Sequence, residues 1–265
     1  MHLPEPVQAI GFAGFSRDLT NVFIGCTISR FVTADFIPAD KTDQADDYNE
    51  RGISFFNLTK YPEAIKEFTR AIKLIDSDPD YYYNRGLAYY SMKMLSQAVK
   101  DYESALKLSP ENSDYHNAIA SALEDSGDLD GAMKHFDEAI RLENDVPDYY
   151  YNRGNVYRKL KKYDKALEDF SKAVELNSAD QIFLFRRYEL YMELGKYQEA
   201  ARDMDVAIRL VPGSTFFQVS KAEALEKDGK IQEALAILED VNISSGSTEE
   251  VQKKIERLKQ SLGQK

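Results

Sequence analysis

The sequence Tyr-Tyr-Tyr-Asn-Arg-Gly occurs at residues 81–86 and again, residue for residue, at 149–154. The two copies are 68 residues apart, which is twice 34, and the same register extends over most of the chain. Self-similarity at one fixed period is the signature of a repeat architecture. The register divides the chain into six abutting units, at residues 45–78, 79–112, 113–146, 147–180, 181–214 and 215–248.

Side-chain size repeats inside each unit and predicts its local structure. Position 8 is mostly glycine or alanine, whereas positions 11 and 24 are mostly large. Positions 4, 8 and 11 lie four and three residues apart and therefore share one face of a helix, as do positions 20, 24 and 27 on a second helix. Small residues at positions 8 and 20 let the two helix axes approach. Position 20 is alanine in every unit: Ala64, Ala98, Ala132, Ala166, Ala200 and Ala234.

This pattern closely resembles the tetratricopeptide repeat (TPR) family, whose unit is a 34-residue helix–turn–helix. The resemblance covers residues 45–248 and implies an all-α, right-handed superhelix. Three of the turns contain a glycine (Gly127, Gly195 and Gly229), which suits a helix C-terminus with positive φ. The fifth unit departs from the pattern because Tyr188 stands at position 8, so we expect that helix pair to open or repack.

The segments that flank the repeats differ from them and from each other. Residues 249–265 place Val251, Ile255, Leu258 and Leu262 on one helix face, which predicts an amphipathic capping helix over the last repeat. Residues 1–44 do not fit the repeat pattern. Their alternating apolar residues between 22 and 28 leave three possibilities open: a partly β element, a disordered extension or a targeting peptide.

Composition excludes several classes of partner. The 265 residues contain 34 Lys and Arg against 45 Asp and Glu, a net charge of −11. Phosphate would repel such a chain, so we expect neither nucleic acid nor an anionic membrane as the main partner. No uncharged apolar stretch approaches the roughly 18 residues of a membrane span. Without a convincing targeting signal, the cytoplasm is the default location.

The sequence contains no recognisable catalytic or metal-binding constellation. The histidines are His2, His116 and His135, and no pair has the spacing of a metal motif. His116 falls at packing position 4 and is expected in the core. Residues 126–131 imitate a calcium loop, but they coincide with the turn of the third unit. We therefore expect no enzyme activity, no metal and no cofactor.

The resemblance implies that positions 2, 5, 6, 9, 12 and 13 of each unit line a concave, peptide-binding groove. An asparagine amide can pair with both the C=O and the N–H of a peptide, and aromatic rings supply rigid contact area. On this basis we expect Asn84 and Asn152 to be exposed. The candidate peptide-binding residues are Tyr83, Asn84, Tyr90, Asn117, Tyr151, Asn152, Asn155, Arg158, Phe185 and Arg186.

Three functions remain open at this point. The first is an adaptor that binds an extended peptide or a partner helix in the groove. The second is an assembly component that self-associates through its end repeats or residues 1–44. The third, a clamp for the C-terminal tail of a chaperone, has poor support because only Asn152 and Arg186 match two of its five positions. The acidic turn of the third unit and the basic turn of the fourth could orient a ligand or could be ordinary solvated edges.

Overall fold

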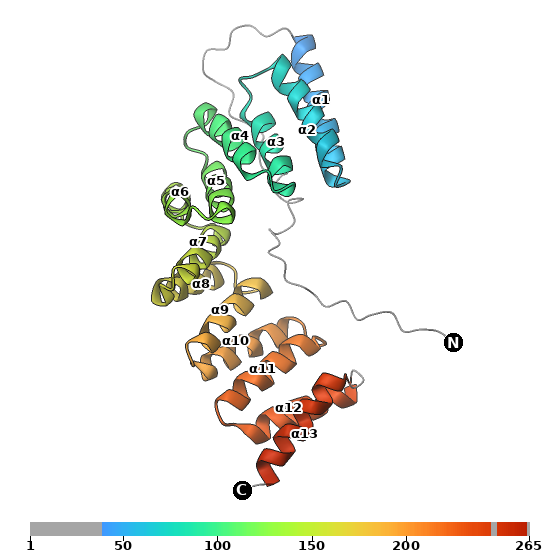
Figure 1. Cartoon of the computed structure of the whole chain (residues 1–265), viewed down its shortest axis with the longest axis vertical. Coiled ribbons are helices and arrows are strands. Elements are labelled where there is room, and N and C mark those ends of the chain that lie inside the picture. Colours follow the sequence, from blue (N-terminus) through green and yellow to red (C-terminus); the bar gives the residue numbers. More distant parts are fainter. Residues whose placement is uncertain (1–38, 245–247, 264–265) are drawn as a thin grey trace, which may run out of the picture.

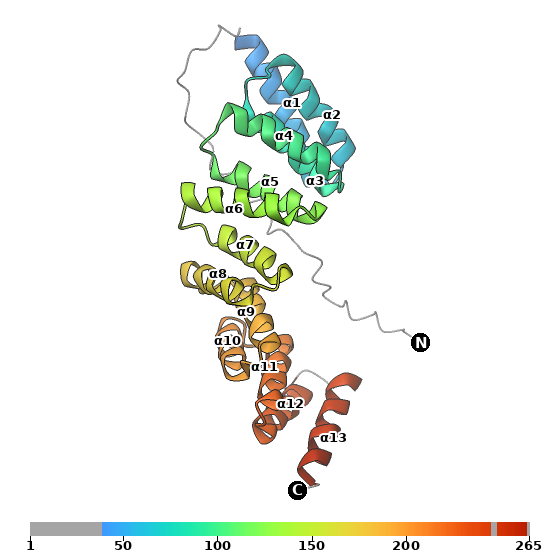
Figure 2. The ribbon, with the colours of Figure 1, turned by 60° about the vertical axis from the view of Figure 1, so that its left-hand side comes forward.

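The described part of the chain is an arc of helices. The computed structural model describes residues 39–244 and 248–263, which form thirteen helices and no strand. Each helix packs mainly against its neighbours in sequence, so the chain is an α-solenoid (Figure 1). Figure 2 shows the helices stacked one after another along the long axis. The helices are α1 Ala39–Asn57, α2 Tyr61–Leu74, α3 Pro79–Ser91, α4 Leu95–Leu108, α5 Ser113–Ser126, α6 Leu129–Leu142, α7 Pro147–Lys159, α8 Tyr163–Leu176, α9 Gln181–Glu193, α10 Tyr197–Leu210, α11 Thr215–Lys227, α12 Ile231–Ser244 and α13 Glu249–Gly263.

The turns between paired helices use the left-handed backbone region in all six units. Gly127, Gly195 and Gly229 have φ values of 91°, 70° and 80°, which confirms the role expected of them. In the other three units a residue with a side chain takes this conformation: Thr59, Lys93 and Lys161, with φ values of 56–59°. Only glycine adopts this region without steric cost, so these three turns are strained relative to the other three.

Glycine at position 8 allows close packing of the paired helices. A methyl group placed on Gly86 would lie 2.5 Å from Cε1 of Tyr102, and one placed on Gly154 would lie 2.8 Å from Cδ1 of Phe170. Carbon atoms do not approach so closely without displacing one another. In these units the ring at position 24 occupies the volume that a side chain at position 8 would need, whereas the third unit accommodates both Ala120 and the Phe136 ring.

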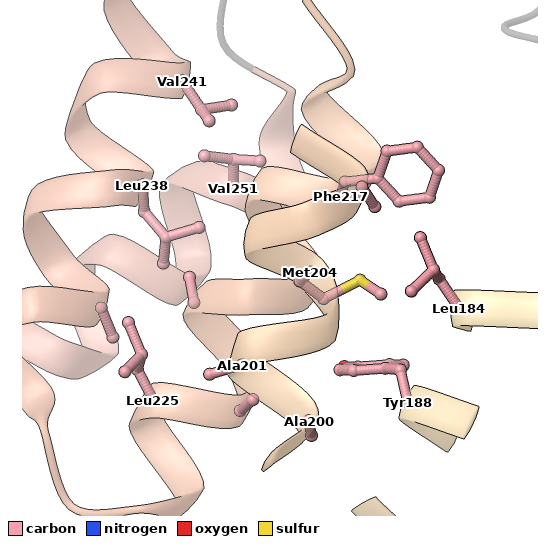
Figure 3. Close-up of a cluster of buried hydrophobic side chains, with 14 of the residues drawn as sticks. Leu184, Tyr188, Ala200, Ala201, Met204, Phe217, Leu225, Leu238, Val241 and Val251 are labelled. Carbon is pink, nitrogen blue, oxygen red and sulfur yellow. The ribbon is translucent and has the colours of Figure 1, made fainter. Parts of the chain in front are cut away.

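The fifth unit repacks instead of opening. Tyr188 is 5% exposed, and its hydroxyl donates a hydrogen bond to the Ser220 carbonyl oxygen at 3.1 Å. The residue at position 24 of this unit is Met204, whose flexible thioether replaces the ring found there in the first four units. Figure 3 shows Tyr188, Met204 and Leu184 converging in this core cluster.

The sequence predicts the helix at the C-terminal end of the array but not the start of the helix at its N-terminal end. Helix α13 buries Val251, Ile255 and Leu258, so it covers the last repeat as predicted, and Figure 3 shows Val251 beside Leu238 and Val241. Helix α1 begins at Ala39, six residues before the predicted start of the first unit, because the polar residues 39–44 continue the helix. The possible strand at residues 22–28 lies outside the described residues. No helix in the described ranges is long and apolar enough to cross a membrane.

Candidate functional site: the inner face of the arc

The first helix of each unit supplies one surface of the solenoid. Figure 1 shows α3 and α5 on the inner side of the arc, with α4 and α6 on its outer side. We use the name inner face for positions 2, 5, 6, 9, 12 and 13 of helices α1, α3, α5, α7, α9 and α11. All ten candidate residues named from the sequence belong to this face, and the structure shows which of them already have partners within the chain.

Tyrosine hydroxyls join successive first helices along the inner face. In three places the tyrosine at position 3 of one unit donates to the aspartate at position 2 of the preceding unit. Burial raises the pKa of Tyr81 and Tyr149 well above the usual range, so both hydroxyls stay protonated and neutral. The three bonds are Tyr81 to Asp46 at 2.5 Å, Tyr115 to Asp80 at 3.0 Å and Tyr149 to Asp114 at 2.7 Å, each to Oδ1.

Asparagines form a second set of links between units. Asn84 Nδ2 donates to Asn49 Oδ1 at 3.0 Å, and Asn152 Nδ2 donates to Asn117 Oδ1 at the same distance. Asn84 is only 5% exposed, so the expectation that it is exposed was wrong, and Asn152 is half-buried. The amide groups that seemed free for a ligand are used instead to hold adjacent repeats together.

Buried ion pairs connect the two helices within a unit, and the sequence analysis missed them. Three arginines at position 7 each form a two-pronged ion pair with an aspartate at position 23. The aspartates are 4–6% exposed, and burial raises the pKa of Asp169 and Asp203 while the facing arginine lowers it. The pairs are Arg85–Asp101 with both bonds at 2.7 Å, Arg153–Asp169 at 2.9 and 2.8 Å, and Arg187–Asp203 at 2.9 and 2.6 Å.

A visible sequence signal marks these ion pairs. Where position 7 is arginine, position 23 is acidic, in the first, second, fourth and fifth units. The third unit loses both members together and has Ile119 and His135 instead. Two residue types that appear and disappear together at a fixed spacing of 16 predict a contact, even within one chain.

Aromatic side chains gather at the C-terminal end of the inner face. The rings of Phe185 and Phe216 have centroids 4.9 Å apart, and Phe185 also stacks on Tyr188 at 5.4 Å and 22°. Phe216 is nevertheless 42% exposed. By contrast, the ring of Tyr83 packs against the rings of Tyr102 and Tyr115, with ring centroids 5.6 and 5.1 Å away. Most of the Tyr83 ring therefore contacts the interior of the protein.

Three of the four cations of the inner face have acidic partners within the chain. Arg158 contacts Glu189 at 3.3 Å and Glu193 at 3.0 Å, and Arg186 Nη1 donates to Glu189 at 2.8 Å. Lys159 contacts Glu124 at 2.9 Å. An ion pair therefore joins the acidic turn of the third unit to the basic turn of the fourth.

The remaining candidate residues lie around these charges. Arg186 Nε is 3.4 Å from the Tyr151 hydroxyl. Tyr90 and Asn155 are half-buried, and the Nζ atom of Lys93 lies 5.3 Å from the centroid of the Tyr90 ring.

Two histidines form a pair in the third unit, away from the inner face. Nδ1 of His116 lies 3.0 Å from Nδ1 of His135, and burial lowers the pKa of both rings. His116 is half-buried, so it is less enclosed than its packing position predicts. In the described ranges, no group of three or more His, Cys, Asp or Glu side chains is arranged to hold a metal ion.

Comparison with known families identifies the repeats. Profiles described as "Tetratricopeptide repeat" match residues 79–112, 147–180 and 185–245, and one described as "TPR repeat" matches 45–93 and 121–161. The chain belongs to the tetratricopeptide repeat family. Its fold is the all-α TPR superhelix expected from the sequence. Two of the matched ranges, 79–112 and 147–180, are the second and fourth units named above.

Solved TPR structures share the fold at low sequence identity. PilF of Pseudomonas aeruginosa is 16% identical, with a TM-score of 0.65 over 84% of this chain and 99% of that one. A tetratricopeptide repeat protein of Parabacteroides merdae is 21% identical, with a TM-score of 0.61 over 83% and 87%. YrrB, described as a TPR protein with an unusual peptide-binding site, is 23% identical, with a TM-score of 0.55 over 68% and 93%. No curated protein matches this chain.

Proposed function

We propose that this TPR protein is a non-enzymatic adaptor whose inner face binds an extended peptide or a helix of a partner protein. A TPR solenoid is in general a protein-interaction scaffold, and the aromatic pair Phe185–Phe216 is the observation that carries the more specific proposal. Exposed aromatic rings clustered on one surface are typical anchors of protein interfaces.

The position of Phe216 distinguishes it from ordinary exposed apolar residues. Position 2 is aspartate in the first four units and becomes Ile182 and then Phe216 in the last two. Phe185, at position 5 of the fifth unit, lies against it. The two rings stand on consecutive first helices, so they form a continuous apolar patch on the inner face.

The other candidate residues divide into two roles. Asn84, Asn117 and Asn152 hold repeats together and are not proposed as ligand contacts. We assign ligand contact to side chains that keep some exposure near the aromatic pair, and to Tyr90 further along the face. These residues are Tyr90, Tyr151, Asn155, Phe185, Arg186 and Phe216.

The peptide-binding site of YrrB supports this proposal by analogy of fold alone. Solenoids present extended concave surfaces because each repeat rotates slightly relative to the last. Such a surface suits an extended ligand, whose main chain and alternate side chains contact several repeats in turn.

Selection from displayed random 12-residue peptides tests the proposal on the full chain. We expect binders that are lost from a Phe216→Ala variant and kept by a Leu210→Ala variant, because Leu210 is equally exposed (40%) but ends α10, a second helix. Both variants must first show wild-type helicity by circular dichroism. Binders that survive Phe216→Ala would refute the inner-face assignment. If light scattering shows a concentration-dependent dimer instead, the assembly function takes its place.

A further inference from the structure

The inner face carries most of the negative charge of the protein. Its 36 positions contain eleven acidic and four basic residues, a net charge of −7 within the −11 of the whole chain. The acidic members are Asp46, Glu50, Asp80, Asp114, Glu124, Asp125, Asp148, Glu189, Glu193, Glu223 and Glu226. The protein therefore concentrates its negative charge on the surface to which we assign ligand binding.

Pairing within the chain makes the N-terminal half of this face more acidic than the C-terminal half. Of the four basic residues of the face, Arg158, Lys159 and Arg186 lie in the fourth and fifth units and none lies in the first three. Arg158 and Arg186 pair with glutamates of the fifth unit, and Lys159 pairs with Glu124 of the third. In the first three units, Asp46, Asp80 and Asp114 accept hydrogen bonds from tyrosine hydroxyls through Oδ1. Within the described residues, none of these three aspartates forms an ion pair.

A neutral donor fixes a carboxylate without cancelling its charge. A tyrosine hydroxyl that donates to a carboxylate brings no opposing charge, whereas an arginine would supply one. The three hydroxyls thus hold three negative groups in a row, one repeat apart, and leave their charge available to a ligand. Oppositely charged surfaces attract and orient a partner before contact.

We propose that the inner face selects a basic segment of a partner protein that also carries an apolar or aromatic side chain. Its lysines and arginines would lie along Asp46, Asp80 and Asp114, and its apolar side chain would pack on Phe185 and Phe216. This proposal rests on the function proposed above and names the chemistry of the partner. Residues 1–38 of the chain itself carry two arginines against three acidic residues, so their charge does not complement this face.

The composition of the selected peptides gives the first test. In the display selection on the full chain, binders sensitive to Phe216→Ala should be enriched in Lys and Arg and contain an apolar residue. Neutral or acidic binders with the same sensitivity would overturn the basic-partner proposal and leave the adaptor function standing. Neutral, phenylalanine-rich binders that resemble residues 1–38 would point to the protein's own N-terminal segment as the occupant. No binders at all would overturn both proposals.

Charge substitution gives the second test and keeps the fold intact. Asp80→Asn/Asp114→Asn removes two charges but retains an Oδ1 acceptor for each tyrosine hydroxyl. A fluorescein-labelled copy of the best selected peptide should bind this variant roughly fivefold more weakly, since each exposed ion pair contributes less than a tenfold effect. The control, Asp130→Asn/Asp164→Asn, removes the same charge from the first turns of α6 and α8.

Comparing the two variants separates the effect of the charges at Asp80 and Asp114 from the effect of the net charge of the protein. Weakening confined to Asp80→Asn/Asp114→Asn supports the proposal, and that difference should shrink as sodium chloride is raised from about 50 mM to about 500 mM, because salt screens exposed charges. Equal affinity for wild type and both variants would overturn it. Equal weakening in both variants would also overturn it, because the effect would then come from net charge and not from these positions.

Discussion

Gly86→Ala should destabilise the protein, although alanine normally stabilises a helix. The added methyl group would lie 2.5 and 2.7 Å from Cε1 and Cδ1 of Tyr102, a ring that is 1% exposed and packs against Tyr83. Overpacking a well-filled core costs typically about 1–3 kcal/mol, and this enclosed ring favours the upper end. Alanine in place of glycine inside a helix stabilises the helix by about 1 kcal/mol, which offsets part of this cost. The expected net loss is about 2 kcal/mol.

Urea unfolding followed by circular dichroism measures this loss. With an m-value of about 2 kcal/mol/M, the midpoint should fall by about 1 M. Gly213→Ala is the matched control, because a methyl group there meets no atom within 4 Å, and its effect should stay within about 0.5 kcal/mol. A midpoint that is unchanged or higher in Gly86→Ala would refute the steric argument.

A double substitution tests the cause directly. Alanine stands at position 8 in two units, with Phe136 at position 24 in the third and Leu238 in the sixth, so the methyl group is accepted where the position-24 side chain leaves room for it. Tyr102→Leu alone should destabilise through lost packing. In the Gly86→Ala background it should cost at least about 1 kcal/mol less, because the new methyl group fills part of the space that the ring leaves. Additive effects would mean that the glycine and the ring are not in contact.

Three further predictions concern charges and backbone strain. Arg187→Met should destabilise the protein at pH 7 by about 3–5 kcal/mol, because Asp203 stays buried without its partner. Burial already raises the pKa of Asp203, so its carboxyl group becomes protonated in the folded state as the pH falls. The loss of stability should therefore shrink at lower pH. A loss that does not depend on pH would contradict this explanation. Thr59→Gly should raise stability by up to about 1 kcal/mol in urea unfolding, since φ is 58° there. The pKa values of His116 and His135 are lowered in the folded state, so the unfolded state binds more protons. The free energy of unfolding should therefore decrease as the pH drops below about 6.5. This decrease should be smaller in His135→Gln.

The sequence predicts the repeat but not all the bonds between repeats. The 34-residue period, the small residues at positions 8 and 20 and the capping helix all follow from spacing, because a helix face is fixed by the 3.6-residue turn. The Asn84–Asn49 bond does not follow, since it depends on how far one first helix is displaced along the next. An asparagine at position 6 therefore looks the same in the sequence whether it faces a ligand or its neighbour.

The positions of the candidate site come from the family resemblance, whereas its chemistry depends on contacts that the sequence does not show. The inner-face positions were assigned by resemblance, and they contain the aromatic patch at Phe185. The repeat pattern does not mark Phe216, because position 2 carries aspartate in four of the six units. The start of α1 was also missed, since residues 39–44 contain no apolar period to mark a helix.

Photo-crosslinking at Phe216 tests the central claim, that partners bind on the inner face, most directly. Phe216→benzoylphenylalanine and Leu210→benzoylphenylalanine place the same reactive group at equally exposed sites, on a first and a second helix respectively. After incubation with the selected peptide, we expect an adduct from position 216 and none from position 210. An adduct from position 210 alone, or a crosslink only to a second copy of this chain, would contradict the account.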